Sequence, residues 1–312
     1  MNKPLRTEAP PTSHITVASL LPVAVLTLVW GCNWPILKMG VAELPPLTFR
    51  SITLPFAAIG LLAAARLSGD SVRIPRPLWL KVVMLGMFNI GVWNGLVLFG
   101  VQQLPAGRSA ILAYTMPVWG VLFSLMLLHE PLSARKIAGM LFGMLGMGVL
   151  LGDDIRHLER TPTAALMIVG AAIAWAFGTV LLRKWKLPVP QNTLAGWMML
   201  LGWIPLAIFA PFFAPLPLRP PSATAWFAIV YTIFLAGTLA HWAWFTLART
   251  LPVAVSSMSS LPVPIVGVFS GMLLLGERPG PNEWIALALV IVALVAVLWA
   301  PRPPAAPLAP DN

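Results

Sequence analysis

The chain has 312 residues, of which 58% are hydrophobic and 10% charged, with a formal net charge of +10 and a mean hydropathy of +0.85. Soluble globular domains are roughly 45–50% apolar and about 25% charged, so this composition excludes an ordinary soluble enzyme, a coiled coil or a disordered protein. The basic residues lie in short loops without interleaved aromatic residues, which argues against a nucleic-acid partner. The single cysteine, Cys32, excludes an intrachain disulfide.

The apolar residues occur in long runs, each about the length that crosses a bilayer. This pattern predicts an all-α polytopic membrane protein. The first 16 residues are polar and rich in Pro and Thr, which indicates a disordered tail and not a secretory signal. Ten spans are expected, at residues 17–37, 46–65, 78–101, 106–128, 136–151, 164–182, 192–212, 223–247, 252–275 and 283–300.

The connections between the expected spans are short, so successive helices should be antiparallel neighbours. The linker between the fifth and sixth spans is expected to hold Asp153, Asp154, Arg156, Glu159 and Arg160. With the N-terminus inside, 13 of the 20 basic residues lie on the cytoplasmic side. We therefore expect both tails, residues 1–16 and 301–312, to be cytoplasmic. An odd number of spans would instead place the termini on opposite faces.

The strongest organisational signal is an internal repeat. Residues 104–130 align without gaps to residues 251–277, and nine of 27 positions are identical. The matches include Pro105 with Pro252, Pro117 with Pro264, Gly120 with Gly267, and Glu130 with Glu277. The chain is thus expected to form two five-helix repeats, residues 17–155 and 156–300. Because five is odd, the second repeat enters the membrane with opposite polarity, a plan common among secondary transporters.

The repeat and its motifs resemble the EamA type of the drug/metabolite transporter superfamily. The residues that carry the resemblance are Trp30-Gly31-x-Asn33, Arg50 early in the second span, Pro117 with Glu130-Pro131, and Pro264 with Glu277. The second Glu-Pro pair is interrupted by Arg278. The resemblance covers residues 17–300 and implies a ten-helix exporter of small metabolites. Within the superfamily the chain is most similar to bacterial amino-acid exporters, including the aromatic amino-acid branch.

Polar and aromatic residues within the spans are the candidates for substrate contacts, because polar groups in hydrocarbon are costly unless they face a cavity or a partner. Trp30, Asn33 and Trp34 share one helix face, and Pro35 should kink the helix there. Indoles around a midplane cavity would suit apolar and aromatic substrates; helix packing is the alternative reading of these residues. The predicted substrate-binding residues are Trp30, Asn33, Trp34, Asn89, Trp93, Asn94, Tyr114, Trp175, Thr179, Tyr231, Thr238 and His241.

Charged residues are scarce in the interiors of the spans. The deep titratable group is His241, so either proton coupling runs through it or transport follows the substrate gradient. Arg50 is expected to anchor a helix end, with a contact to a substrate carboxylate as the alternative. Glu130 and Glu277 should cap helices or act in gating on opposite faces. The cavity is then expected to be nearly neutral, which suits zwitterionic amino acids.

These features predict a secondary transporter that exports amino acids, aromatic or neutral, by alternating access in the bacterial inner membrane. A multidrug or other metabolite exporter is the alternative. An enzyme is disfavoured because Ser133 stands where a zincin motif beginning at His129 would need histidine. No cofactor or metal site is expected. The expected partners are a small-molecule substrate and lipid, with no nucleic acid, and the protein is expected to be a monomer, although Gly139, Gly143 and Gly146 could form a dimer face.

Overall fold

The computed structural model describes residues 17–129, 132–156, 162–213, 220–244 and 262–298, and every regular element in these ranges is helical. The expected tails, Glu130, and the first part of the ninth predicted span lie outside the described residues. In the first half the elements are α1 (Val17–Glu43), α2 (Pro46–Leu67), the 3₁₀ turn η1 (Arg76–Leu78), α3 (Trp79–Gly86), the π-helix η2 (Met87–Val92), α4 (Trp93–Gln103), α5 (Ala106–Ala113), α6 (Met116–Leu128) and α7 (Ala134–Arg156). In the second half they are α8 (Pro162–Trp185), α9 (Gln191–Phe213), α10 (Ala223–Val230), the π-helix η3 (Tyr231–Leu239), α13 (Val263–Leu275) and α14 (Pro281–Leu298).

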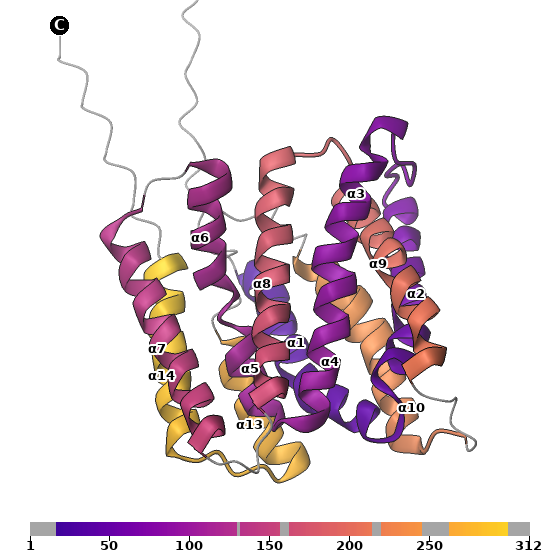
Figure 1. Cartoon of the computed structure of the whole chain (residues 1–312). Coiled ribbons are helices and arrows are strands. Elements are labelled where there is room, and N and C mark those ends of the chain that lie inside the picture. The colour runs from indigo at the N-terminus through magenta and orange to yellow at the C-terminus, as the bar shows by residue number, and fades with distance from the viewer. Residues whose placement is uncertain (1–16, 130–131, 157–161, 214–219, 245–261, 299–312) are drawn as a thin grey trace, which may run out of the picture.

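The helices form a bundle whose apolar segments agree with the predicted spans (Figure 1). Eight of the segments are long and apolar enough to cross a bilayer. The ninth and tenth predicted spans correspond to shorter apolar helices, Val263–Leu275 and Pro281–Ala296, so the count of ten crossings stays a prediction. Large apolar side chains such as Leu80, Phe212 and Leu273 are exposed on the outside of the bundle. Such a surface is stable against lipid tails and unstable in water.

The two halves repeat the same backbone pattern at the spacing found in the sequence. Helix α6 spans residues 116–128 and α13 spans residues 263–275, so both bounds differ by 147. Each helix ends at a left-handed residue, His129 with φ 56° and Gly276 with φ 67°, and these positions also differ by 147. Helices α6 and α7 meet at one end of the molecule, and α13 and α14 meet at the opposite end (Figure 1). The repeats are therefore inverted relative to each other.

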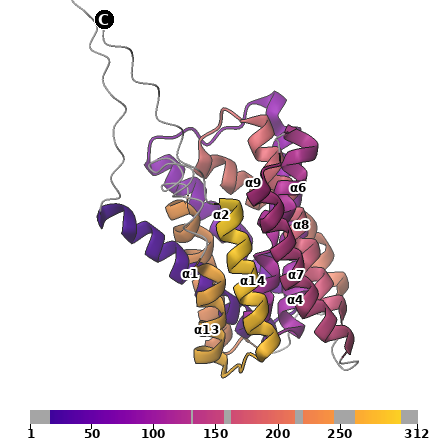
Figure 2. The same ribbon diagram turned by 90° about the vertical axis from the view of Figure 1, so that its left-hand side faces the viewer.

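Packing between the halves is close. Helix α2 packs along α9, α1 along α13, and α7 along α14, so each of these contacts joins one repeat to the other (Figure 2). Where α9 meets η2, Gly202 faces the backbone at Gly86 and Gly91. Glycine allows this contact because it has no Cβ between the two backbones.

The structure corrects two details of the predicted spans. The fourth span is not one helix, because the chain leaves the helix at Tyr114–Thr115, immediately before Met116 and Pro117, and restarts as α6. Proline lacks the N–H that would continue the helical ladder, which explains the break. The fifth span is longer than expected: α7 continues through Asp153 and Asp154 to Arg156, and the linker is correspondingly shorter.

Candidate functional site

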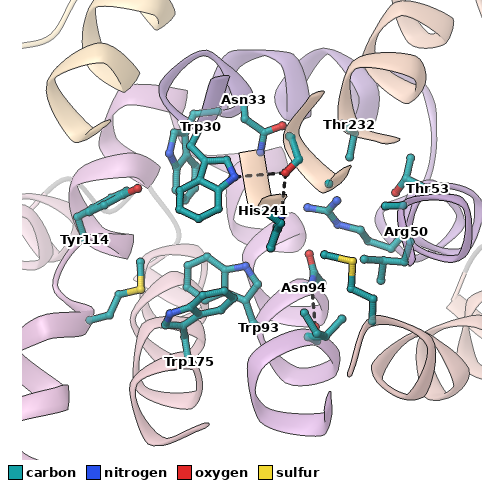
Figure 3. A pocket seen from close by; sticks show the side chains of 18 residues that line it. Trp30, Asn33, Arg50, Thr53, Trp93, Asn94, Tyr114, Trp175, Thr232 and His241 are labelled. Atoms are coloured by element: carbon teal, nitrogen blue, oxygen red, sulfur yellow. Dashed lines mark hydrogen bonds between the residues drawn. The ribbon is translucent and has the colours of Figure 1, made fainter. Parts of the chain in front are cut away.

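A cavity of about 140 Å³ lies between the two repeats (Figure 3). Helices α1, α2, α4, α8 and α9, the two π-helices, the junction between α5 and α6, and His241 after η3 all contribute to its wall. The lining residues are Trp30, Asn33, Trp34, Arg50, Thr53, Leu54, Ala57, Ile90, Trp93, Asn94, Tyr114, Met116, Trp175, Met199, Thr232, Ala236, Gly237 and His241.

The α1 face of the cavity is the one that the sequence predicts. Trp30, Asn33 and Trp34 all line it. Pro35 removes the N–H that would bond to the carbonyl of Gly31, four residues earlier. The hydroxyl of Ser270, on α13, donates to that carbonyl at 3.3 Å. The Gly31 carbonyl, which Pro35 leaves without its helical donor, therefore joins α1 to the other repeat, while α1 remains helical to Glu43.

The two π-helices, η2 and η3, both contribute to the cavity wall, and they lie at equivalent positions of the two repeats. The 147-residue spacing maps η2, Met87–Val92, onto residues 234–239 within η3. The same spacing maps Asn94 onto His241, and each of these side chains contacts the backbone of its own helix. Asn94 Nδ2 donates to the Ile90 carbonyl at 2.9 Å. His241 Nδ1 lies 2.9 Å from the Ala236 carbonyl oxygen. Single π-turns are frequent at functional sites because they redirect neighbouring side chains.

Aromatic rings form a large part of the wall. The rings of Trp93 and Trp175 pack with centroids 5.1 Å apart, and Trp30 meets His241 edge to face at 5.3 Å. Trp30 Nε1 donates to the Ala236 carbonyl at 3.3 Å, which fixes one indole across the repeat interface. Tyr114 closes another side of the cavity from the break between α5 and α6 (Figure 3). These rings give an apolar wall with few rotatable bonds, suited to an apolar or aromatic group.

The expectation of a nearly neutral cavity is wrong, because Arg50 lines it (Figure 3). The side chain of Arg50 is buried and reaches inward from the first turns of α2. No Asp or Glu among the described residues lines the cavity. The described part of the wall therefore carries a guanidinium without a balancing carboxylate.

Four of the predicted residues do not line the cavity: Asn89, Thr179, Tyr231 and Thr238. Asn89 Nδ2 donates to the Trp175 carbonyl at 3.2 Å and to Thr179 Oγ1 at 3.3 Å, so this pair joins η2 to α8. Tyr231 donates to the Val29 carbonyl at 2.8 Å, and Thr238 to the Ile233 carbonyl at 2.9 Å. These side chains serve helix packing, because each of them donates a hydrogen bond to a neighbouring backbone or side-chain oxygen.

The sequence reasoning missed several lining residues, chiefly Thr53, Met116, Met199 and Thr232. Thr53 lies one helical turn after Arg50, at a spacing that puts both on one face of α2. That spacing would have strengthened the alternative in which Arg50 contacts the substrate. Met116, Met199 and Thr232 carry no comparable signal, because isolated residues of these kinds are common in membrane helices.

The model of the EamA-like transporter family matches this chain twice, over residues 18–152 and 162–299. The chain belongs to the EamA-like transporter family. As a member of that family it is a multi-pass membrane transporter, in agreement with the resemblance found in its sequence.

Similar EamA-family proteins are themselves named as transporters. The uncharacterized inner membrane transporter YedA of Escherichia coli is 28% identical over 92% of this chain and 94% of its own length. The uncharacterized transporter YoaV of Bacillus subtilis is 23% identical over 84% of this chain and 90% of its own length. An Escherichia coli protein named "Probable amino-acid metabolite efflux pump" is 24% identical over 86% of this chain and 91% of its own length.

A solved crystal structure shares the fold with a TM-score of 0.64 and 21% sequence identity, covering 90% of this chain and 96% of that chain. At this identity the likeness concerns the fold alone.

Proposed function

We propose that this EamA-family transporter exports small metabolites, foremost amino acids with aromatic or neutral side chains, by alternating access around the central cavity. The observation that carries the proposal is the cavity wall, which both repeats build and which combines indole rings with a few convergent polar groups. Substrate sites of inverted-repeat transporters lie at the repeat interface near the membrane midplane. The similarity to a protein named as an amino-acid metabolite efflux pump supports the same substrate class.

The size of the cavity favours a small metabolite over the alternative, a multidrug exporter. Its volume of about 140 Å³ is close to that of a cavity that holds benzene, about 150 Å³. Pockets for drug-sized ligands are larger, roughly 300–1,000 Å³. This size suits a small molecule that carries one aromatic or branched aliphatic group.

The inverted repeats supply a physical basis for alternating access. When two halves of similar structure are related by inversion, exchanging their conformations converts a state open to one side into a state open to the other. The break between α5 and α6, and the π-helices η2 and η3, place irregular backbone beside the cavity. Because irregular segments absorb changes of φ and ψ more readily than a continuous helix, we infer that these points bend during transport.

Location and orientation complete the proposal. YedA is named an inner membrane transporter, which supports the same location for this chain, and the distribution of basic residues supports a cytoplasmic position for both termini. The end of the molecule that carries the α2–α3 and α6–α7 connections would then face the cytoplasm (Figure 1).

The test is counterflow in proteoliposomes containing the purified protein. We expect saturable exchange of aromatic or neutral amino acids and none of cationic drugs. Exchange of drugs but not of amino acids would favour the multidrug alternative. Ionic conductance without saturation would contradict a carrier.

A second comparison at two pH values tests the role of His241. If coupling runs through this residue, His241→Ala abolishes the dependence of net transport on a proton gradient. If transport follows the substrate gradient alone, wild type and His241→Ala respond alike to that gradient. The matched control is His129→Ala, because His129 is exposed at the end of α6 and does not line the cavity.

A further inference from the structure

Arg50 is a buried cation without a partner in the part of the protein that the structure describes. Its side chain is 6% exposed, and its Nε atom is buried with no hydrogen-bond acceptor. No hydrogen bond or ion pair links its guanidinium to another described residue. The guanidinium lies over the ring of Phe49, the preceding residue, and interacts electrostatically with His241 across the cavity wall. A guanidinium carries five N–H donors, and a buried charge is costly unless it is paired. The arrangement is therefore incomplete without an anion.

Arg108 is a second buried arginine of this chain, and in contrast to Arg50 its guanidinium has partners within the protein. Arg108 is 1% exposed, but its Nη1 lies 3.0 Å from Glu283 Oε1 and its Nη2 donates to the Leu150 carbonyl. The charge of Arg108 is thus balanced within the protein, although its Nε, like that of Arg50, is buried without an acceptor among the described residues. Arg50 differs because its unpaired group opens onto the cavity.

We propose that Arg50 binds the carboxylate of the transported substrate, an inference that rests on the function proposed above. A carboxylate presents two oxygens to the planar guanidinium and can accept paired hydrogen bonds from it. The low polarity of the surrounding wall strengthens this attraction relative to water. Arg50 is then the residue that selects for an acid group among the small molecules that the cavity admits.

The same cavity also offers acceptors for an ammonium group. Asn33 Oδ1 and Thr232 Oγ1 are both buried without a hydrogen-bond partner, and both residues line the cavity. Asn33, Thr232 and Arg50 approach one side of it from α1, η3 and α2 (Figure 3). An ammonium group supplies N–H donors to the two oxygens while the carboxylate takes the guanidinium. This pairing specifies the zwitterionic head of an α-amino acid.

The wall's charge determines which compounds are rejected. An amine without a carboxylate leaves Arg50 unpaired and brings a second positive charge into a wall that has no described carboxylate. Since a hydrogen bond to a charged group contributes about 1.5–3 kcal/mol, the loss of the carboxylate should weaken binding by roughly 10- to 100-fold. This rejection excludes cationic amphiphiles, which a multidrug exporter would carry.

The experiment measures binding to the purified full-length protein by titration calorimetry, with two matched sets of probes. One set is phenylalanine, phenethylamine and 3-phenylpropionate; the other is leucine, 3-methylbutylamine and 4-methylpentanoate. In wild type we expect each amino acid to bind most tightly and each amine most weakly. In Arg50→Gln the advantage of the amino acid over its amine should disappear, and Arg50→Lys should restore part of it.

Two results would overturn the role of Arg50. One is an amine that binds wild type as tightly as its amino acid. The other is Arg50→Gln with the wild-type preference intact. If neither amino acid binds, and a panel of further amino acids shows no counterflow, the proposed function itself fails and this inference fails with it. Binding of amino acids that does not depend on Arg50 leaves the proposed function standing.

Thermal unfolding of the ligand-free protein separates substrate binding from a structural role. If Arg50 only anchors the start of α2, Arg50→Gln lowers the unfolding temperature as Arg108→Gln does, and the proposal is wrong. If the role of Arg50 is to bind the substrate carboxylate, Arg50→Gln removes an unpaired buried charge from the ligand-free protein. The unfolding temperature then stays the same or rises. Arg108→Gln is the matched control, since it breaks a pair that the structure shows complete.

Discussion

The carboxylate of Glu277, just beyond the end of α13, accepts a hydrogen bond from the backbone N–H of Gly107, in the first turn of α5, with Oε2 3.1 Å from the nitrogen. Its other oxygen accepts from the N–H of Ala106 at 2.6 Å and lies 3.6 Å from Lys38 Nζ. A carboxylate at a helix N-terminus satisfies N–H groups that have no partner within the helix. Glu277 therefore joins the second repeat to two helices of the first.

We expect Glu277→Ala to lower the free energy of unfolding by about 1–3 kcal/mol, because it leaves the backbone N–H groups of Ala106 and Gly107 without their acceptor and removes the carboxylate partner of Lys38, which keeps its bond to the Leu104 carbonyl. It should also speed maleimide labelling of Cys32, whose side chain lies near Ser270 between α1 and α13. Thermal unfolding and labelling kinetics in detergent measure both effects.

The control is Glu43→Ala. Glu43 also caps a helix of the other repeat, by accepting from the N–H of Ser222 at 3.0 Å, but it is exposed. Solvent replaces the lost acceptor there, so its effect on stability should be smaller. Equal effects of the two substitutions would show that Glu277 is not a special junction between the repeats.

The structural role of Glu277 could be anticipated from its place in the repeat, whereas the sequence could not decide between the two roles considered for Arg50 and gave no role for Arg108. Arg50 and Arg108 each stand near the start of a hydrophobic span and look alike in sequence. Their difference depends on Glu283 and Leu150, which are distant in the chain from both. Pairing across such distances has no local signal, and the expectation that Arg50 anchors a helix end came from its position alone.

Hydropathy and the 147-residue repeat were sufficient for the helical class and the inverted arrangement, because membrane spans and internal duplication leave strong patterns. The π-helices η2 and η3 were not foreseen, since a π-turn adds a residue to a helix without a characteristic sequence. Asn89 illustrates the result for the site. In a regular α-helix Asn89 and Trp93, four residues apart, would share one face. In the structure Asn89 lies in η2 and bonds to α8, while Trp93 follows η2 and lines the cavity.

The close contact at Gly202 gives a prediction about packing. A Cβ at this position would lie 2.5 Å from the Gly86 carbonyl oxygen and 2.8 Å from the Gly91 nitrogen. Both atoms belong to backbone, so relief requires a whole helix to move. We expect Gly202→Ala to destabilise the protein by about 1–3 kcal/mol or more.

The matched control for Gly202 is Gly148→Ala, because a Cβ at Gly148 in α7 would meet nothing within 4 Å. Alanine is favoured over glycine in helices by about 0.5–1 kcal/mol, so this substitution should be neutral or stabilising. Unfolding temperatures of the two variants in the same detergent provide the comparison. A stable Gly202→Ala protein would mean that α9 and η2 are farther apart than described.

The aromatic wall predicts a change of selectivity. Trp175 packs against Trp93 and lines the cavity, so Trp175→Ala should weaken binding of aromatic amino acids more than of small ones. An aromatic contact contributes about 0.5–1.5 kcal/mol beyond its buried area, which corresponds to a loss of roughly 2- to 10-fold in relative affinity. Competition for counterflow between phenylalanine and alanine measures the ratio.

Trp79→Ala is the control for the aromatic wall. Trp79 packs edge to face on Trp197 with centroids 4.9 Å apart, but neither residue lines the cavity. The substitution should leave the phenylalanine-to-alanine ratio at its wild-type value. If both variants change the phenylalanine-to-alanine ratio equally, the effect comes from a general loss of packing, and Trp175 does not contribute to selectivity for aromatic substrates.

The inverted repeats and the basic loops together predict which ends of the helices face the cytoplasm. Ser68 follows the last residue of α2, and Ala42 lies one residue before the end of α1. Both positions are exposed, and they lie at opposite ends of the bundle because α2 starts near the end of α1 and crosses the bundle to Ser68. In a Cys32→Ser background, we expect a membrane-impermeant maleimide to label Ala42→Cys in intact cells and Ser68→Cys only after permeabilisation. The opposite pattern would place the N-terminus outside, whereas labelling of both positions from one side would contradict a membrane crossing by α2 and with it the inverted arrangement of the repeats.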